Sequence, residues 1–102
     1  EAARSGVRAV LVHNDQDALQ LPSLLRTHGL TVPEDVAMIA YDDVYASLSE
    51  PPLTAVAPPK RAVGSGALDL LLRRLDAGGA LPVHQIELLP TLKLRKSCGG
   101  PA

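Results

Sequence analysis

The chain contains three short, mostly apolar runs, each ended by polar or conformationally restricted residues. They cover residues 8–12, 36–40 and 53–57. Runs of this length without alternation are typical of strands in a parallel sheet whose two faces are both covered. Pro58-Pro59 follows the third run and ends it, because proline has no amide hydrogen to donate to a sheet ladder. The pattern therefore predicts three strands of an α/β protein.

Two stretches with apolar residues at helical spacing accompany these strands. The first follows Asn14 and Asp15, either of which can cap a helix through a side-chain oxygen, and it ends at Gly29. Pro22 lies inside this pattern and predicts a kink or a break, because it removes a backbone donor. The second stretch, residues 60–77, has one leucine-rich face. Strand, helix and strand within roughly 35 residues predict a right-handed βαβ unit.

The remaining segments predict less regular structure. Residues 44–48 could form one helical turn. Residues 84–89 alternate imperfectly and are a candidate strand, whereas residues 91–95 alternate cleanly and predict a half-buried edge strand. Residues 97–102 are interpreted as a frayed tail in which Cys98 has no role.

Composition narrows the class of protein. The 102 residues form one domain at most, and the net charge of −1 with mixed acids and bases argues against a nucleic-acid surface on this chain. A single cysteine excludes an internal disulfide. The apolar runs fall far short of the roughly 20 residues that cross a bilayer, so no membrane association is expected. The single cysteine fits a reducing compartment, and a cytoplasmic location is predicted. The chain begins at Glu1 rather than Met, which favours a piece of a longer protein.

Candidate chemistry is concentrated at Asp42-Asp43, directly after the second apolar run. Open α/β sheets bind ligands at the carboxyl ends of their strands. Adjacent residues of an extended strand point to opposite faces, so the two carboxylates are not expected to act on one substrate as an acid/base pair. This geometry favours one Asp as a ligand-binding group, with the other capping a helix or exposed to solvent. The three histidines lack metal-ligand spacing, and no nucleophile and base stand at plausible spacing. We therefore predict no catalytic residue, metal site or cofactor, and a small α/β enzyme is the disfavoured alternative.

Six short motifs, in this order, resemble the effector-binding domain of LacI/GalR-type bacterial transcription repressors. They are Asn14-Asp15 with Ala18, the segment Gly29 to Val36, Tyr41-Asp42-Asp43, the segment Pro51 to Val56, Gly64 with Leu70-Leu71-Leu72, and the segment Pro90 to Ser97. The resemblance implies a type I periplasmic-binding-protein-like α/β fold, of which this chain would be a C-terminal fragment. Departures from the family pattern occur at Gln20, Pro22, Ala40, Ala55 and the segment 58–60.

The same resemblance implies a division of the chain. Residues 1–58 would belong mostly to the C-terminal subdomain, and residues 59–89 would be the helix and strand of a segment that crosses between subdomains. Residues 90–102 would be the returning strand and tail. The helix over residues 60–77 is predicted either to fold back onto the chain's own sheet or to be covered by a second chain.

Site residues also follow from the resemblance. Asn14 and Asp42 match positions that contact a small effector, and Tyr41 matches a position beside the pocket or in the hinge region. His13 stands at a strand end, where it could line the same site. The surface of the first helix, including Leu19, and the region around Ser49 match the family's dimer interface.

The resemblance implies the effector-sensing and dimerisation portion of a DNA-binding repressor. The effector would be a sugar or a nucleobase, and the protein would be a homodimer. DNA would be contacted only through an N-terminal head that is absent from this sequence. The alternative is a fragment of a periplasmic sugar-binding protein of the same fold.

Overall fold

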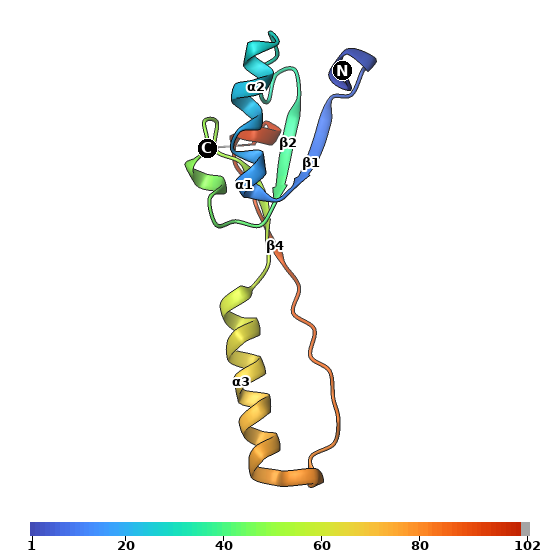
Figure 1. Ribbon diagram of the computed structural model, residues 1–102, viewed down its shortest axis with the longest axis vertical. Helices are drawn as coiled ribbons and strands as arrows, with labels where there is room; N and C mark the ends of the chain where they lie inside the picture. Colours follow the sequence, from blue (N-terminus) through green and yellow to red (C-terminus); the bar gives the residue numbers. More distant parts are fainter. Residues whose placement is uncertain (101–102) are drawn as a thin grey trace. The chain divides into compact units, whose positions relative to one another are not determined.

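The computed structural model describes residues 1–100, and the chain divides into two compact units (Figure 1). The first unit contains Glu1–Ala57 and the residues from Thr91 onward, and the second contains Pro58–Pro90. The chain leaves the first unit after Ala57 and re-enters it at Thr91.

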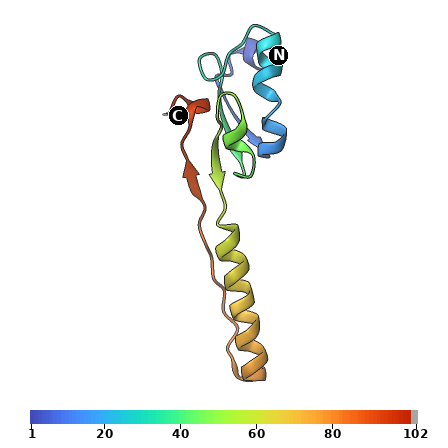
Figure 2. The same cartoon turned by 90° about the vertical axis from the view of Figure 1, so that its left-hand side faces the viewer.

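The first unit is built on a four-stranded sheet. The strands are β1 (Ala9–His13), β2 (Ala37–Tyr41), β3 (Thr54–Ala57) and β4 (Thr91–Lys93), and they lie in that order across the sheet. The first three run parallel, while β4 pairs antiparallel with β3, as Figure 2 shows. The predicted parallel βαβ sheet is therefore confirmed, and the fold is α/β.

Two short helices connect β1 to β2. They are α1 (Asp15–Ala18) and α2 (Leu21–Thr27). The predicted break is confirmed, because Pro22 stands in the first turn of α2, where its missing amide costs nothing. The side-chain oxygen of Asn14 accepts a hydrogen bond from the Asp17 amide at 3.3 Å and caps α1. Gly29 follows α2 with a φ of +78°, a conformation that side chains disfavour.

The core lies between α1, α2 and one face of the sheet. Its buried members include Ala18, Met38, Leu53 and Ala55, with Val10, Val12, Leu21 and Leu25 packed against them. The prediction that both sheet faces are covered is wrong within the described residues. Leu11 lies on the opposite face of β1 and remains 69% exposed.

The segment after β4 also differs from the sequence prediction. Instead of fraying, it forms a 3-10 helix, η4 (Lys96–Cys98), and Ser97 is fully buried. The Cys98 sulfur lies 2.9 Å from the Thr54 hydroxyl, so this cysteine packs against the sheet. Residues 101 and 102 of the predicted tail lie outside the described residues.

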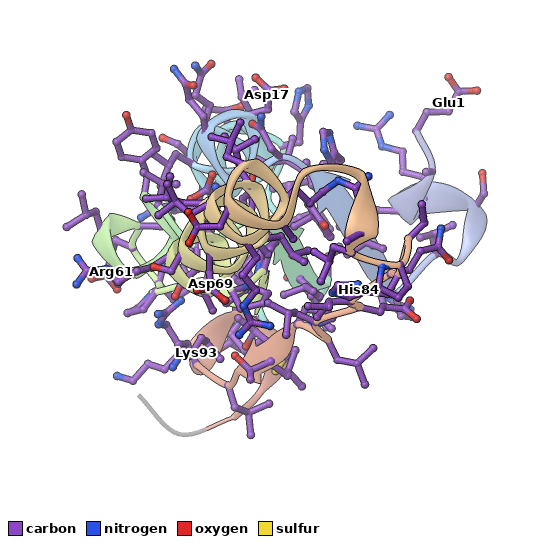
Figure 3. All side chains as sticks on the ribbon, turned by 90° about the horizontal axis from the view of Figure 1, so that it is seen from below. Glu1, Asp17, Arg61, Asp69, His84 and Lys93 are labelled. Carbon is purple, nitrogen blue, oxygen red and sulfur yellow. The ribbon has the colours of Figure 1, made fainter. Side chains whose placement is uncertain are left out.

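The second unit contains one long helix, α3 (Lys60–Ala77), with the predicted bounds. Among the described residues, none in α3 is buried, and Leu71 is 53% exposed. Arg61 and Asp69 are among the side chains that project from it (Figure 3), and Asp69 pairs with Arg73 at 3.0 Å. Whether this helix is covered by the chain's own sheet or by a second chain stays a prediction. Residues 84–89 are irregular rather than a strand.

Three further 3-10 turns complete the described elements. They are η1 (Ala3–Ser5), η2 (Ala46–Leu48) and η3 (Gly78–Ala80). The turn η2 confirms the helical turn expected after Asp43.

A carboxylate before β2 gives a pH-dependent prediction. The Thr31 amide and hydroxyl donate to Asp35 at 2.8 and 2.9 Å and hold the pKa of that carboxyl below its ordinary value. A depressed folded-state pKa stabilises the fold above the unfolded-state pKa of about 3.9, and this contribution is lost as pH falls through the folded-state value. We expect NMR titration to give a low pKa for Asp35, and Thr31→Ala to raise it. A normal pKa in the unmodified chain would contradict this.

Candidate functional site

Polar side chains from two neighbouring strands meet at the carboxyl edge of the sheet. His13 and Tyr41 are the last residues of β1 and β2 and are register partners. Their rings stack with centroids 5.4 Å apart and an interplanar angle of 28°. Asn14 and Asp42 follow them directly in the chain. The four residues predicted as effector-binding therefore lie together, and we call them the carboxyl edge.

Asp42 has an unusual backbone conformation. Its φ is +84°, and among the described residues it is the only non-glycine with a positive φ. Its amide donates to the Val56 carbonyl at 2.9 Å, a bond that belongs to the pairing of Tyr41 with Val56 at the end of β2. A left-handed residue, rather than the extended strand assumed from the sequence, separates the directions of Asp42 and Asp43. Such residues are uncommon outside glycine and concentrate at functional sites.

Asn14 and Asp15, the two candidate caps of the first helix, have different roles in the structure. Asn14, not Asp15, caps α1 through its side-chain oxygen. In the described residues its side-chain nitrogen makes no hydrogen bond, so this donor is available to a ligand. The buried Asp15 carboxylate instead accepts from the Tyr45 amide and anchors the loop that follows Asp43.

Asp43 takes part in an ion pair that the sequence did not reveal. The Arg95 guanidinium donates to both Asp43 carboxylate oxygens, at 2.8 and 3.0 Å, and to the Leu53 carbonyl at 2.8 Å. Both charged side chains are only 18% exposed. Asp43 is therefore neither a cap nor solvated. The sequence shows both partners, Asp43 in the acidic dipeptide and Arg95 in the Arg-x-Ser motif. They lie far apart in the chain, so no local pattern predicts that they form an ion pair.

The residues predicted for a dimer interface lie on the helical side of the sheet. Leu19 is half-buried and packs against the core. Ser49 is buried at 9% exposure, and its hydroxyl has no partner among the described residues. Beside it, Val44, Tyr45 and Leu48 are exposed by 56%, 43% and 76%.

The carboxyl edge is an open wall rather than a closed cavity. A cavity of about 550 Å³ lies at the opposite, amino end of β2 and β3, among residues that include Arg26, Pro33, Pro51 and Lys96. Its lining shares no residue with the carboxyl edge. Within residues 1–100, no cluster of three or more metal-ligating side chains is found. No described helix is long and apolar enough to cross a bilayer.

An open, mostly parallel sheet with polar residues at its carboxyl edge is the arrangement found in ligand-binding α/β domains. Residues 1–98 match the family model of the periplasmic binding protein-like domain. The transcriptional repressor PurR of Vibrio campbellii is 46% identical over 68 residues, which are 66% of this chain and 20% of that protein. PurR of Histophilus somni is 40% identical over 91 residues, 87% of this chain and 27% of that protein.

Solved structures that resemble this chain are also those of transcriptional regulators. A complex of the transcriptional regulator CelR with cellobiose superposes with a TM-score of 0.78 at 36% identity, over 91% of this chain and 28% of that chain. A dimeric Lac repressor with an 11-residue C-terminal deletion gives 0.76 at 36% identity, over 92% and 34%. The chain belongs to the periplasmic binding protein-like domain family, in the form of the effector-binding domain of LacI/GalR-type regulators. It spans 20–27% of the length of these curated relatives, which are transcriptional repressors and not enzymes.

Proposed function

We propose that this chain is the effector-sensing portion of a LacI-type transcriptional repressor and that the carboxyl edge forms one wall of its effector site. The observation that carries the proposal is the convergence of His13, Asn14, Tyr41 and Asp42 at the ends of β1 and β2. A second subdomain would supply the other wall.

The chemistry of this wall suits a sugar or a nucleobase. The Asp42 carboxylate accepts strongly from hydroxyl or ring N–H groups, and the Asn14 amide nitrogen can donate. The stacked pair of His13 and Tyr41 offers ring faces beside these polar groups. Solved relatives hold cellobiose in one case and sucrose in another.

Assembly and DNA binding are part of the same proposal. The exposed apolar side chains of Val44, Tyr45 and Leu48, next to Ser49, would pack on a second copy, and Leu19 would lie at the rim of this contact. DNA would be bound through an N-terminal head, and the effector would change the relative pose of two subdomains and thus the spacing of two heads. We propose a cytoplasmic location for such a regulator.

The test is calorimetric titration of the complete polypeptide, expressed from its full reading frame, with a panel of sugars and purine bases. Asp42→Asn removes the charged acceptor, so the affinity for the best ligand should fall by at least about tenfold, because a hydrogen bond to a charged group contributes roughly 1.5–3 kcal/mol. Asp76→Asn makes the same change at an exposed position in the second unit and should leave affinity unchanged. Equal affinities for the two variants would contradict the site.

DNA binding separates the proposal from its alternative. A repressor should bind double-stranded DNA from its own upstream region, and the ligand should change that affinity. Ligand binding by a polypeptide that shows no DNA affinity would favour a periplasmic sugar-binding protein instead.

A further inference from the structure

We propose that Arg95 is a positioning residue for the effector site, because it holds Asp43 and thereby fixes the adjacent turn at Asp42. This inference rests on the proposed function of the carboxyl edge. It gives the Arg-x-Ser ending of the chain a role in ligand recognition, although Arg95 itself belongs to the segment after β4.

The ion pair between Arg95 and Asp43 has a defined geometry. Both Arg95 terminal nitrogens donate to the Asp43 carboxylate, at 2.8 and 3.0 Å, and one also donates to the Leu53 carbonyl at 2.8 Å. A two-pronged arginine–carboxylate pair restricts orientation as well as distance, which a lysine cannot reproduce. With both side chains 18% exposed, water screens the pair only partly.

Arg95 is itself fixed at its backbone. Its amide donates to the Thr54 hydroxyl at 2.8 Å, and the same hydroxyl lies 3.1 Å from the Arg95 carbonyl. Thr54 is fully buried at the start of β3. The guanidinium therefore projects from a rigid point of the sheet and not from a loose tail.

The turn at Asp42 requires such a support. Its φ of +84° is unfavourable for a residue with a side chain. On one side the chain is held by β2, which ends at Tyr41, and by the bond from the Asp42 amide to Val56. On the other side, Asp43 is held by Arg95. Without the second anchor the turn can relax toward an ordinary conformation, and the Asp42 carboxylate leaves the orientation that the ligand requires.

Titration calorimetry of the complete polypeptide with its best-binding sugar or purine base tests this inference. Arg95→Lys keeps the charge but loses the two-pronged geometry, and Asp43→Asn removes the partner charge. Each should lower affinity by about tenfold, and the double variant should bind no worse than the weaker single variant, because both changes break one interaction.

A control separates positioning from general destabilisation. Val32→Ala opens the core at the amino end of β2, so it should lower the melting temperature as much as Arg95→Lys does while affinity stays unchanged. Equal losses of affinity in Val32→Ala and Arg95→Lys would overturn the inference, as would additive losses in the double variant. If Asp42→Asn lowers affinity but Arg95→Lys and Asp43→Asn do not, this inference alone fails. If Asp42→Asn also binds normally, the proposed function of the edge fails with it.

Discussion

Leu53→Ala should reduce the free energy of unfolding of this chain by about 2–5 kcal/mol, the range observed when a large aliphatic side chain is truncated in a packed core. Leu53 is fully buried in the cluster that contains Met38, Ala46 and Ala55. Three of these four residues are small or unbranched, so they offer little bulk that could collapse into the cavity. A domain of this size has a total stability of about 5–15 kcal/mol, so the loss would bring the variant close to unfolding at room temperature.

Urea denaturation followed by circular dichroism measures this change. The midpoint should move to lower urea while the slope of the free energy against urea stays constant, because the surface exposed on unfolding is nearly the same. Leu89→Ala is the matched control, since Leu89 is 76% exposed and lies outside the proposed dimer contact, so its truncation should change stability by less than about 0.5 kcal/mol. Similar midpoints for the two variants would show that Leu53 does not belong to a packed core.

The elements that the sequence predicted well depend on local pattern. The helix over residues 60–77 has the predicted bounds because Pro59 precedes it and Gly78, with a φ of +60°, follows it. The break in the first helix follows from Pro22, whose missing amide can be tolerated only near a helix start. Each of these outcomes is determined within a few residues, so neighbouring sequence is sufficient to predict it.

The features that the sequence did not predict depend on distant partners. Residues 96–98 look like a polar tail, but Ser97 is buried because it bonds to groups 43 and 59 residues away. Asp43 and Arg95 are 52 residues apart, so their pairing depends on β4 returning beside β3. Residues 84–89 have strand-like composition, but a strand also needs a neighbour to pair with, and the structure provides none within the described residues.

The exposed face of β1 shows that burial cannot be predicted from apolar composition alone. The apolar run over residues 8–12 correctly predicted a strand, but apolar composition states only that a face is suited to burial. Leu11 is 69% exposed in the described chain, as is much of the leucine face of α3. Pattern therefore predicts which surfaces are suited to burial, whereas the partner that covers them has to come from elsewhere in an assembled protein.

Asn14, Tyr41 and Asp42 were predicted from the family resemblance and His13 from its place at a strand end, and the structure brings these four residues together. Their roles toward a ligand remain the proposal made above. The left-handed conformation of Asp42 could not be predicted, because even Asp, which is enriched in that region, adopts it uncommonly and no neighbouring glycine marks a turn. The support behind it, Arg95, lies in a segment that looked structurally unimportant.

Ser97→Ala should destabilise the chain by several kcal/mol although it removes a single oxygen atom. The Ser97 hydroxyl donates to the Met38 carbonyl at 2.6 Å and accepts from the Thr54 amide at 2.8 Å. Because Ile39 and Thr54 are register partners, a hydrogen bond from the Thr54 amide to the Met38 carbonyl would be a rung of the parallel ladder. The hydroxyl bridges the two groups at this rung, and its removal takes a hydrogen-bond partner from each of these buried backbone groups, at roughly 1–3 kcal/mol each.

Two measurements check this prediction. Urea denaturation gives the loss of stability, and Ser23→Ala, at an exposed position on α2, should cost less than about 0.5 kcal/mol. Amide hydrogen exchange then locates the cause, because the Thr54 amide should lose protection in Ser97→Ala while the amides at the centre of β2 keep theirs. If Thr54 exchanges as slowly as before, β2 and β3 have closed the rung directly, and the serine is a spacer whose loss the sheet can absorb. If exchange is fast and stability falls, η4 completes the ladder between β2 and β3. In that case the C-terminal Arg-x-Ser segment has two structural tasks in one turn, with Arg95 fixing the loop after β2 and Ser97 fixing the start of β3.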